Sequence, residues 1–214
     1  MTNVSTTLSY LGLRKAVGLL GVSLPFILAV GGLLFGAGLQ GSMSAYYYTN
    51  LRAIFIGNLW ATGSFLFSYR GYELADEIAA KVASISAIGI SLFPTTLPPP
   101  AIPSSTAMLV ENVHAACTAV FFLTLSYFAL VLFTKTDPTQ TPTPKKLQRN
   151  TVYRVCGYTI IVCILLILAH NLLPSTAMAG IEAYKPVFVL ETFAVLAFGS
   201  SWLVKGETIL KDDV

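Results

Sequence analysis

The sequence has few charged residues: Asp, Glu, Lys and Arg make up only 11% of its 214 residues. A typical soluble domain has about 25% charged residues. With 55% hydrophobic residues as well, this composition excludes an ordinary water-solvated globular protein, and we expect lipid to cover much of the surface. The net charge of +3 does not indicate nucleic-acid binding, because the basic residues flank apolar stretches.

Cysteines and known catalytic motifs are also scarce. Cys117, Cys156 and Cys163 lie within apolar stretches and none belongs to a CxxC pair, so we interpret them as buried small hydrophobic residues rather than disulfide partners. The chain has no Walker loop, no dinucleotide fingerprint, no HExxH sequence and no GxSxG elbow. These absences leave nucleotide-dependent enzymes and the hydrolases that use such motifs without support.

Six apolar stretches have about the length of a membrane crossing. They predict an all-α fold, a six-transmembrane-helix bundle, with residues 1–214 forming a single integral membrane domain. The predicted spans cover about residues 17–40, 51–69, 78–93, 107–133, 151–172 and 186–204.

The basic residues fall mostly on one side of this predicted bundle. If the connecting segments alternate between two sides, one side has 11 of the 13 Lys and Arg residues, and the other has only Arg52 and Lys185. The positive-inside rule assigns the basic side to the cytoplasm. We therefore predict that both termini are cytoplasmic and that this is a multi-pass protein of a bacterial inner membrane.

Two connecting segments are rich in proline. Residues 95–105 include Pro98-Pro99-Pro100, which favours a stiff, extended outer loop. Residues 134–150 are polar and proline-rich, which predicts a flexible linker. Either Ser104 or Ser105 is placed to cap the helix of the fourth span.

Ionisable and aromatic residues gather at the outer ends of the predicted spans. A rise of about 1.5 Å per helical residue places His114, His170 and Glu191 at comparable outer depths. Glu191 is the only carboxylate within a span on that side, and such a group usually faces a partner or a polar cavity. We therefore predict a polar pocket that opens outward. Its candidate ligand-binding residues are Tyr46, Tyr47, Tyr48, Arg52, Glu111, His114, His170 and Glu191.

The chemistry of these residues stays open at this level. Glu191 suits a proton acceptor, a metal ligand or a cation site, or a structural partner of Arg52, Lys185 or a tyrosine hydroxyl. With the two histidines it forms a possible zinc set, and the histidines alone a possible haem pair. Ser42 or Ser44 is a possible nucleophile beside a histidine. We favour hydrogen-bonded histidines, with no metal and no cofactor.

Gly32 and Gly36 form a GxxxG pair in the first span. Small residues at this spacing let another helix approach closely. We favour packing within the chain, and the alternative is a homo-oligomer or a membrane protein partner.

Three segments, SMSAYYYTNLRAIFIGNL, LFSYRGYE and RNTVYRVCGY, resemble a poorly characterised group of small prokaryotic polytopic membrane proteins. This resemblance implies a membrane fold and no particular activity. More distantly, the chain resembles the ceramidase and progestin-receptor-like membrane hydrolases, which use serine, aspartate and three histidines around zinc. This chain differs in having two histidines and six predicted spans rather than seven.

These features favour a non-enzymatic membrane protein whose outward-facing pocket binds a lipid or small ligand, or docks a membrane partner. One alternative is a metal-dependent hydrolase that acts on a lipid. Another is a small transporter with Glu191 as its coupling carboxylate. Few polar residues occur in the inner halves of the spans, which counts against transport.

Overall fold

The computed structural model describes residues 10–96, 104–136, 139, 141–174 and 180–211. These residues form six long helices and three short helical turns, and no strand occurs among them. The predicted all-α fold is therefore confirmed. The long helices are α1 (Tyr10–Leu34), α2 (Arg52–Ser68), α3 (Leu74–Leu92), α4 (Ser105–Tyr127), α5 (Pro144–Leu172) and α7 (Pro186–Lys205). The short turns are η1 (Ser44–Tyr48), η2 (Phe128–Leu132), which continues α4 as a π turn, and η3 (Glu182–Tyr184).

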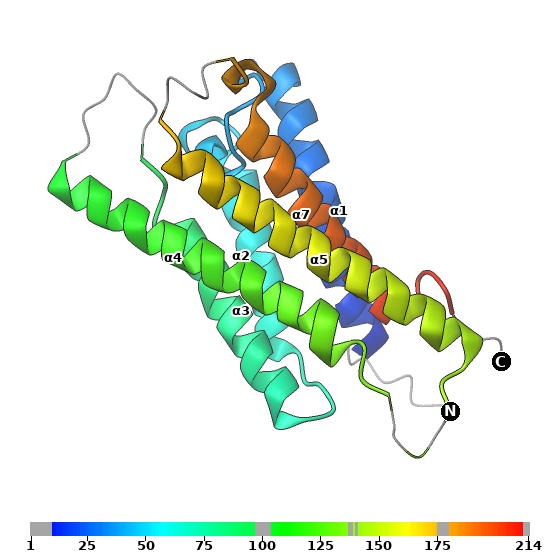
Figure 1. Ribbon diagram of the computed structural model, residues 1–214. Helices are drawn as coiled ribbons and strands as arrows, with labels where there is room; N and C mark the ends of the chain where they lie inside the picture. The colour runs from blue at the N-terminus through cyan, green and yellow to red at the C-terminus, as the bar shows by residue number, and fades with distance from the viewer. Residues whose placement is uncertain (1–9, 97–103, 137–138, 140, 175–179, 212–214) are drawn as a thin grey trace, which may run out of the picture.

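The six long helices form a closed ring in which each packs on the next one in sequence and α7 packs back on α1. α1 begins and α7 ends at the same end of the bundle (Figure 1). We call this the basic end, because Arg14, Lys146 and Lys205 lie there. The opposite end, with η1 and both histidines, is called the histidine end.

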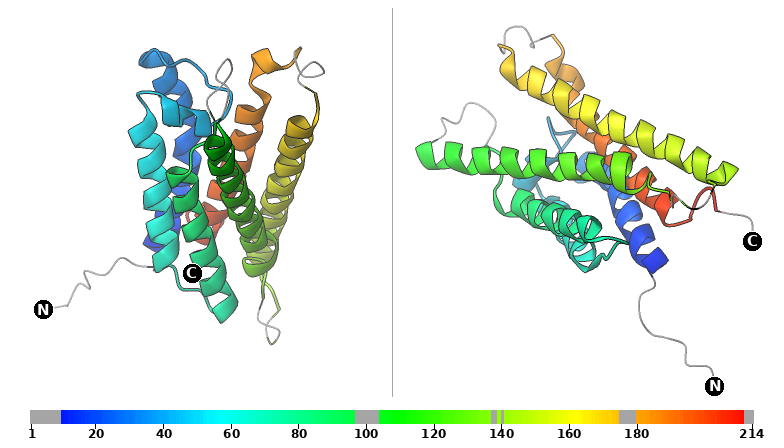
Figure 2. Two further views of the ribbon diagram at one scale, coloured as in Figure 1. Left: turned by 90° about the vertical axis from the view of Figure 1, so that its left-hand side faces the viewer. Right: turned by 60° about the horizontal axis from the view of Figure 1, so that its bottom comes forward.

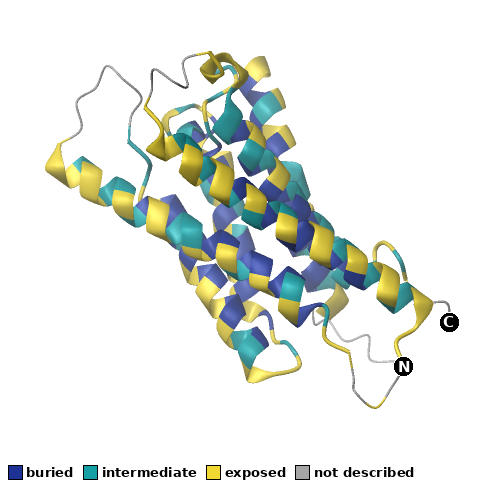
Figure 3. Ribbon diagram, viewed as in Figure 1, coloured by how far each residue is buried: buried dark blue, intermediate teal, exposed yellow. Residues whose placement is uncertain are grey.

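Four helical segments are long and apolar enough to cross a membrane: Tyr10–Leu34, Ser105–Leu132, Pro144–Leu172 and Glu182–Lys205. The outward faces of α4 and α5 are largely exposed (Figure 3). Large apolar side chains such as Val162 and Leu165 are more than half exposed on α5. Apolar surface of this extent is typical of a protein that contacts lipid, so the four helices support a membrane protein.

The first helix is shorter at the histidine end than the predicted 17–40 span, because it ends at Leu34. Gly36 and Gly38 follow with φ angles of 77° and 68°. Glycine adopts this left-handed conformation without steric cost and commonly terminates helices. The chain leaves the helix axis here and runs back over the bundle toward η1, so residues 35–40 form a loop.

Gly32 and Gly36 do not form one helical packing face, because Gly36 lies beyond the end of α1. Gly32 itself packs within the chain. A Cβ atom there would lie 2.4 Å from the Gly38 carbonyl oxygen and 2.9 Å from the Tyr46 hydroxyl oxygen. An oligomer through this pair stays an untested prediction.

The prediction of a flexible linker over residues 134–150 is wrong for its second half, because α5 begins at Pro144. The Thr143 hydroxyl accepts a hydrogen bond from the Lys146 amide at 3.1 Å, and proline is well suited to a first helical turn. These two local signals extend the helix about two turns beyond its apolar part, which fixes several basic residues on a rigid element.

Local capping also sets the starts of α3 and α4. Glu73 and Asp76 form a reciprocal capping box, so α3 begins at Leu74 rather than at the predicted residue 78. The Ser104 hydroxyl accepts from the Ala107 amide at 3.2 Å, which confirms the predicted cap. The stiff proline loop expected between these helices falls largely on residues 97–103, outside the described residues.

Aromatic rings fill the bundle interior toward the basic end. The Trp202 ring lies 5.1 Å from that of Tyr69, 5.4 Å from Phe128 and 5.3 Å from Phe133, measured between centroids. Tilted and edge-to-face pairs of this kind stabilise a packed core. This aromatic cluster consists of Tyr69, Phe121, Phe128, Phe133, Tyr153, Phe198 and Trp202.

Candidate functional site

A cleft of about 650 Å³ lies at the histidine end between α4 and α5. The two helices meet toward the basic end and diverge toward the histidine end (Figure 2, left). Gly157 of α5 permits the meeting, since a Cβ atom there would lie 2.4 Å from Leu130. The Ser126 hydroxyl also donates to the Gly157 carbonyl oxygen at 3.4 Å. The cleft therefore follows from one close contact and the divergence beyond it.

The cleft has apolar walls and a polar floor. α4 provides Ala115, Ala119 and Phe122, and α5 provides a face of isoleucine and leucine. The floor is formed by Ser44, Thr118, His114 and Glu191, and Glu111 lies on the same helix as His114. Two carboxylates thus line the cleft, and no Lys or Arg is among its described lining residues. This arrangement suits an amphipathic ligand whose polar group is neutral or cationic.

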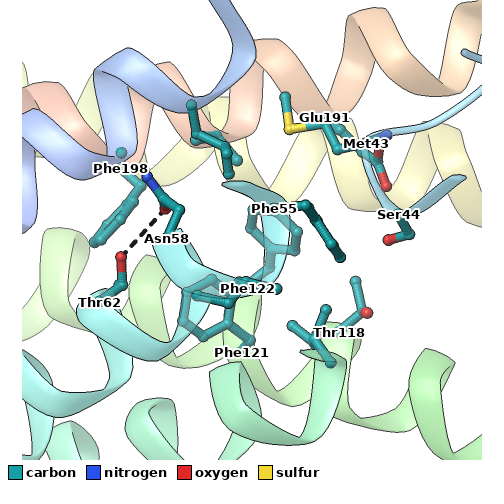
Figure 4. A pocket seen from close by; sticks show the side chains of 15 residues that line it. Met43, Ser44, Phe55, Asn58, Thr62, Thr118, Phe121, Phe122, Glu191 and Phe198 are labelled. Atoms are coloured by element: carbon teal, nitrogen blue, oxygen red, sulfur yellow. Dashed lines mark hydrogen bonds between the residues drawn. The ribbon is translucent and has the colours of Figure 1, made fainter. Parts of the chain in front are cut away.

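Glu191 lies at the base of the cleft, in the second turn of α7 after Pro186, and is 9% exposed. Its Oε2 atom accepts a hydrogen bond from the Met43 amide at 2.5 Å, and the two residues lie side by side in Figure 4. The expected partners, Arg52 or a tyrosine hydroxyl, are wrong: the Arg52 guanidinium donates to the Tyr47 hydroxyl and stacks over that ring. No sequence pattern had indicated a main-chain partner for Glu191.

Ser44 and His114 form a buried hydrogen-bonded pair on the same floor. The His114 Nδ1 atom lies 2.7 Å from the Phe93 carbonyl oxygen, and its Nε2 atom lies 3.0 Å from the Ser44 hydroxyl oxygen. A carbonyl only accepts, so Nδ1 must have the hydrogen. The neutral imidazole then accepts the Ser44 proton at Nε2. Sequence position alone had suggested a serine beside a histidine, without selecting between Ser42 and Ser44.

His170 does not join His114 and Glu191. Its Nε2 atom lies 2.9 Å from a carboxylate oxygen of Glu182, and it is not part of the cleft lining. Within the described residues, no group of three His, Cys, Asp or Glu side chains is placed to hold a metal ion. The zinc hypothesis for these three residues therefore gains no support from the geometry.

The three consecutive tyrosines stabilise the loop that forms the floor. Tyr46 is fully buried, and burial raises the pKa of its phenol, so it stays a hydrogen-bond donor to the Gly38 carbonyl at 3.2 Å. The Tyr48 hydroxyl donates to the Thr95 carbonyl at 2.6 Å. These contacts hold the chain segments around the cleft together, and a ligand-binding role for the tyrosines stays a prediction.

A small cavity of about 50 Å³ continues from the cleft floor toward the bundle centre (Figure 4). Asn58 and Thr62 of α2 line it, and the Asn58 amide donates to the Leu20 carbonyl at 3.1 Å. Phe121 and Phe198, which belong to the aromatic cluster, close it. The polar lining therefore ends at the aromatic cluster, and this geometry does not favour the transporter alternative.

Comparisons of the chain with protein families, curated proteins and solved structures gave no match. The resemblances drawn from short segments therefore stay predictions, and the functional argument depends on the geometry of the site.

The Met43–Glu191 hydrogen bond predicts different effects for two substitutions. Glu191→Ala leaves a buried amide without an acceptor, so we expect a loss of about 1–3 kcal/mol in unfolding free energy. Glu191→Gln keeps a carbonyl oxygen for Met43 and should lose less than half as much. Reversible unfolding of the purified protein in mixed micelles measures both values. Equal losses in the two variants would contradict a structural role for this bond.

Proposed function

We propose that this protein crosses the membrane six times, with both termini in the cytoplasm, and binds a single amphipathic lipid in the cleft between α4 and α5. The observation that supports it is the combination of apolar walls open between two helices and a polar, buried floor. An acyl chain would lie along the walls, with its headgroup at Ser44, His114 and Glu191.

The ring arrangement supports six crossings. α1 begins and α7 ends at the same end, which requires an even number of crossings by the helices between them. α2 and α3 lie in the same ring as the four long apolar helices. The 17 residues of α2 span about 26 Å, close to the hydrocarbon thickness of about 30 Å.

Cysteine labelling tests this orientation. In a variant without its three native cysteines, Tyr184→Cys introduces a thiol at an exposed position of the histidine end. Gln148→Cys does so at the basic end. A membrane-impermeant maleimide should label Tyr184→Cys in intact cells, and Gln148→Cys only after the membrane is disrupted. The reverse pattern would invert the proposed topology.

The charged residues that line the cleft limit which lipid headgroups can bind there. Glu111 and Glu191 are the two carboxylates of the cleft, and the burial of His114 disfavours its cationic form. An anionic headgroup would meet like charge there, whereas an amine or hydroxyl headgroup finds acceptors in a low-dielectric site. We therefore propose a long-chain amine or a hydroxyl-headed lipid as the ligand.

Filling the cleft should abolish this binding. Ala119→Trp adds a large side chain to the wall, so we expect at least tenfold weaker binding of a fluorescent long-chain amine to protein in nanodiscs. Ala116→Trp is the matched control, since Ala116 is exposed on the same helix and does not line the cleft. An unchanged affinity in Ala119→Trp would refute the cleft as the binding site.

The Ser44–His114 pair favours a second candidate function, acyl hydrolysis without a metal. The Ser44 hydroxyl would attack the carbonyl carbon of a lipid ester while its proton passes to the His114 Nε2 atom. The ester C–O bond then breaks, and His114 returns the proton to the leaving alcohol. A water molecule hydrolyses the acyl-serine with His114 as the base. The Phe93 carbonyl would orient the imidazole and stabilise its protonated form.

A fluorophosphonate probe distinguishes hydrolysis from binding alone. We expect stoichiometric labelling of the wild-type protein and none in Ser44→Ala, because within the described part of the chain only the Ser44 hydroxyl lies within hydrogen-bond distance of a histidine nitrogen. Ser42→Ala is the control: Ser42 also lines the cleft, but its hydroxyl accepts from the Ala45 amide. Labelling that persists in Ser44→Ala, or fails in the wild type, would rule out the dyad.

A further inference from the structure

A second cavity, of about 610 Å³, lies at the basic end on the other side of the aromatic cluster. It is bounded by α1, α3, α5, α7 and the segment before α5. Tyr153 of the cluster lines it, whereas Phe121 and Phe198 line the small cavity near the cleft. The cavity at the basic end is therefore separated by the aromatic cluster from the small cavity and the cleft. Five basic residues line the second one: Arg14, Lys135, Lys146, Arg149 and Lys205.

Arg14 is the most informative of these residues, because it is only 7% exposed. Its Nη1 atom donates to the Lys205 carbonyl at 3.5 Å, and its Nε atom is buried without a hydrogen-bond partner in the described structure. The guanidinium lies 5.7–6.0 Å from the ring centroids of Tyr10, Tyr69 and Tyr72. Cation–π contacts with these three rings offset only part of the free-energy cost of burying the guanidinium charge.

Lys205 is only partly buried, and its ammonium likewise lies against aromatic rings. Its ammonium lies 5.4 Å from the ring centroid of Tyr72 and 5.3 Å from that of Phe133. Among the described residues, neither Lys205 nor Arg14 forms an ion pair with a carboxylate. Two cations therefore share a largely buried site and repel each other.

The nearby carboxylates form no ion pair with Arg14 or Lys205 among the described residues. Glu73 pairs with Lys135 at 2.7 Å, and Asp76 is 3% exposed and accepts from the Glu73 amide at 3.2 Å. Of the acidic residues that line the cavity, this leaves Glu207. Asp76 attracts the Lys205 ammonium electrostatically but forms no ion pair with it. A buried cation with no carboxylate in direct contact is unfavourable, so an anion in the cavity would complete the site.

We propose that the cavity at the basic end binds a phosphate group, held by Arg14 and Lys205. The planar guanidinium donates two hydrogen bonds to one phosphate, and the ammonium adds a compact charge. A phosphate monoester has a charge near −2 and three acceptor oxygens, which matches two cations better than a carboxylate does. The phosphate belongs either to a soluble ester or to a lipid headgroup, and both supply the same chemistry.

Trp202 offers a direct signal, since its ring contacts Phe133, over which Lys205 lies. The chain has two tryptophans, so Trp60→Phe leaves Trp202 as the only one. In nanodiscs of zwitterionic lipid, we expect glycerol 3-phosphate to change its fluorescence with saturation. Nanodiscs that contain phosphatidic acid test the lipid source. Saturation by either probe supports the proposal and identifies the source.

Substitutions distinguish a phosphate-binding role of Arg14 and Lys205 from a role in stabilising the fold alone. Lys205→Met removes a partly buried cation that has no carboxylate in contact, so the ligand-free variant should be more stable than the wild type while its phosphate affinity falls at least tenfold. Arg14→Lys keeps the charge but loses the guanidinium, and should bind several-fold more weakly. Lys81→Gln is the control, because Lys81 is exposed on α3 outside the cavity lining.

Three outcomes would overturn the proposal. They are a wild-type response to neither probe, equal weakening by Lys81→Gln and Lys205→Met, and a less stable Lys205→Met protein that still binds phosphate normally. Ala119→Trp should leave the phosphate response unchanged, because it alters only the cleft. Failure of lipid binding in the cleft therefore does not affect this test.

Discussion

The close contact between α4 and α5 at Gly157 is the constraint on which the rest of the structure depends. Any larger side chain there would collide with Leu130 of the π turn. Two straight helices that touch at one point and cross at an angle must separate with distance from it, so their halves at the histidine end leave a cleft. α7 packs along α5 and brings Glu191 to the base of that cleft. The packing of the Leu130 side chain against Gly157 thus positions side chains several turns away.

The sequence predicted the features that depend on local composition. Apolar stretches indicated the helices, and a carboxylate within such a stretch indicated that Glu191 would face the interior, as it does. The hydrogen-bond partners of the site residues were not predictable in this way. Met43 reaches Glu191 because Gly36 and Gly38 redirect the chain after α1, and no periodicity encodes that path. The pairing of His170 with Glu182 depends on η3, which hydropathy does not reveal.

Side chains from distant elements also form the two sites that the sequence suggested least clearly. Ser44 and His114 are 70 residues apart and meet only because the floor loop crosses to α4. Arg14 and Lys205 are 191 residues apart and meet because α1 packs against α7. Basic residues at the membrane border are expected from topology alone. Arg14 and Lys205 differ from that expectation because Arg14 is buried, Lys205 is partly buried and neither forms an ion pair with a carboxylate among the described residues. The aromatic cluster between the two sites makes them structurally independent.

The side opening of the cleft has a consequence for selectivity. A ligand that enters from water gains free energy when its hydrocarbon is buried, but one that enters from the bilayer leaves an environment as apolar as the cleft walls. Chain length should then contribute little to discrimination between lipids, and the number of hydrogen bonds formed at the floor should contribute most. The relevant concentration is the mole fraction of the ligand in its leaflet, so adding more of an inert lipid weakens binding by dilution even when the total amount of ligand is constant.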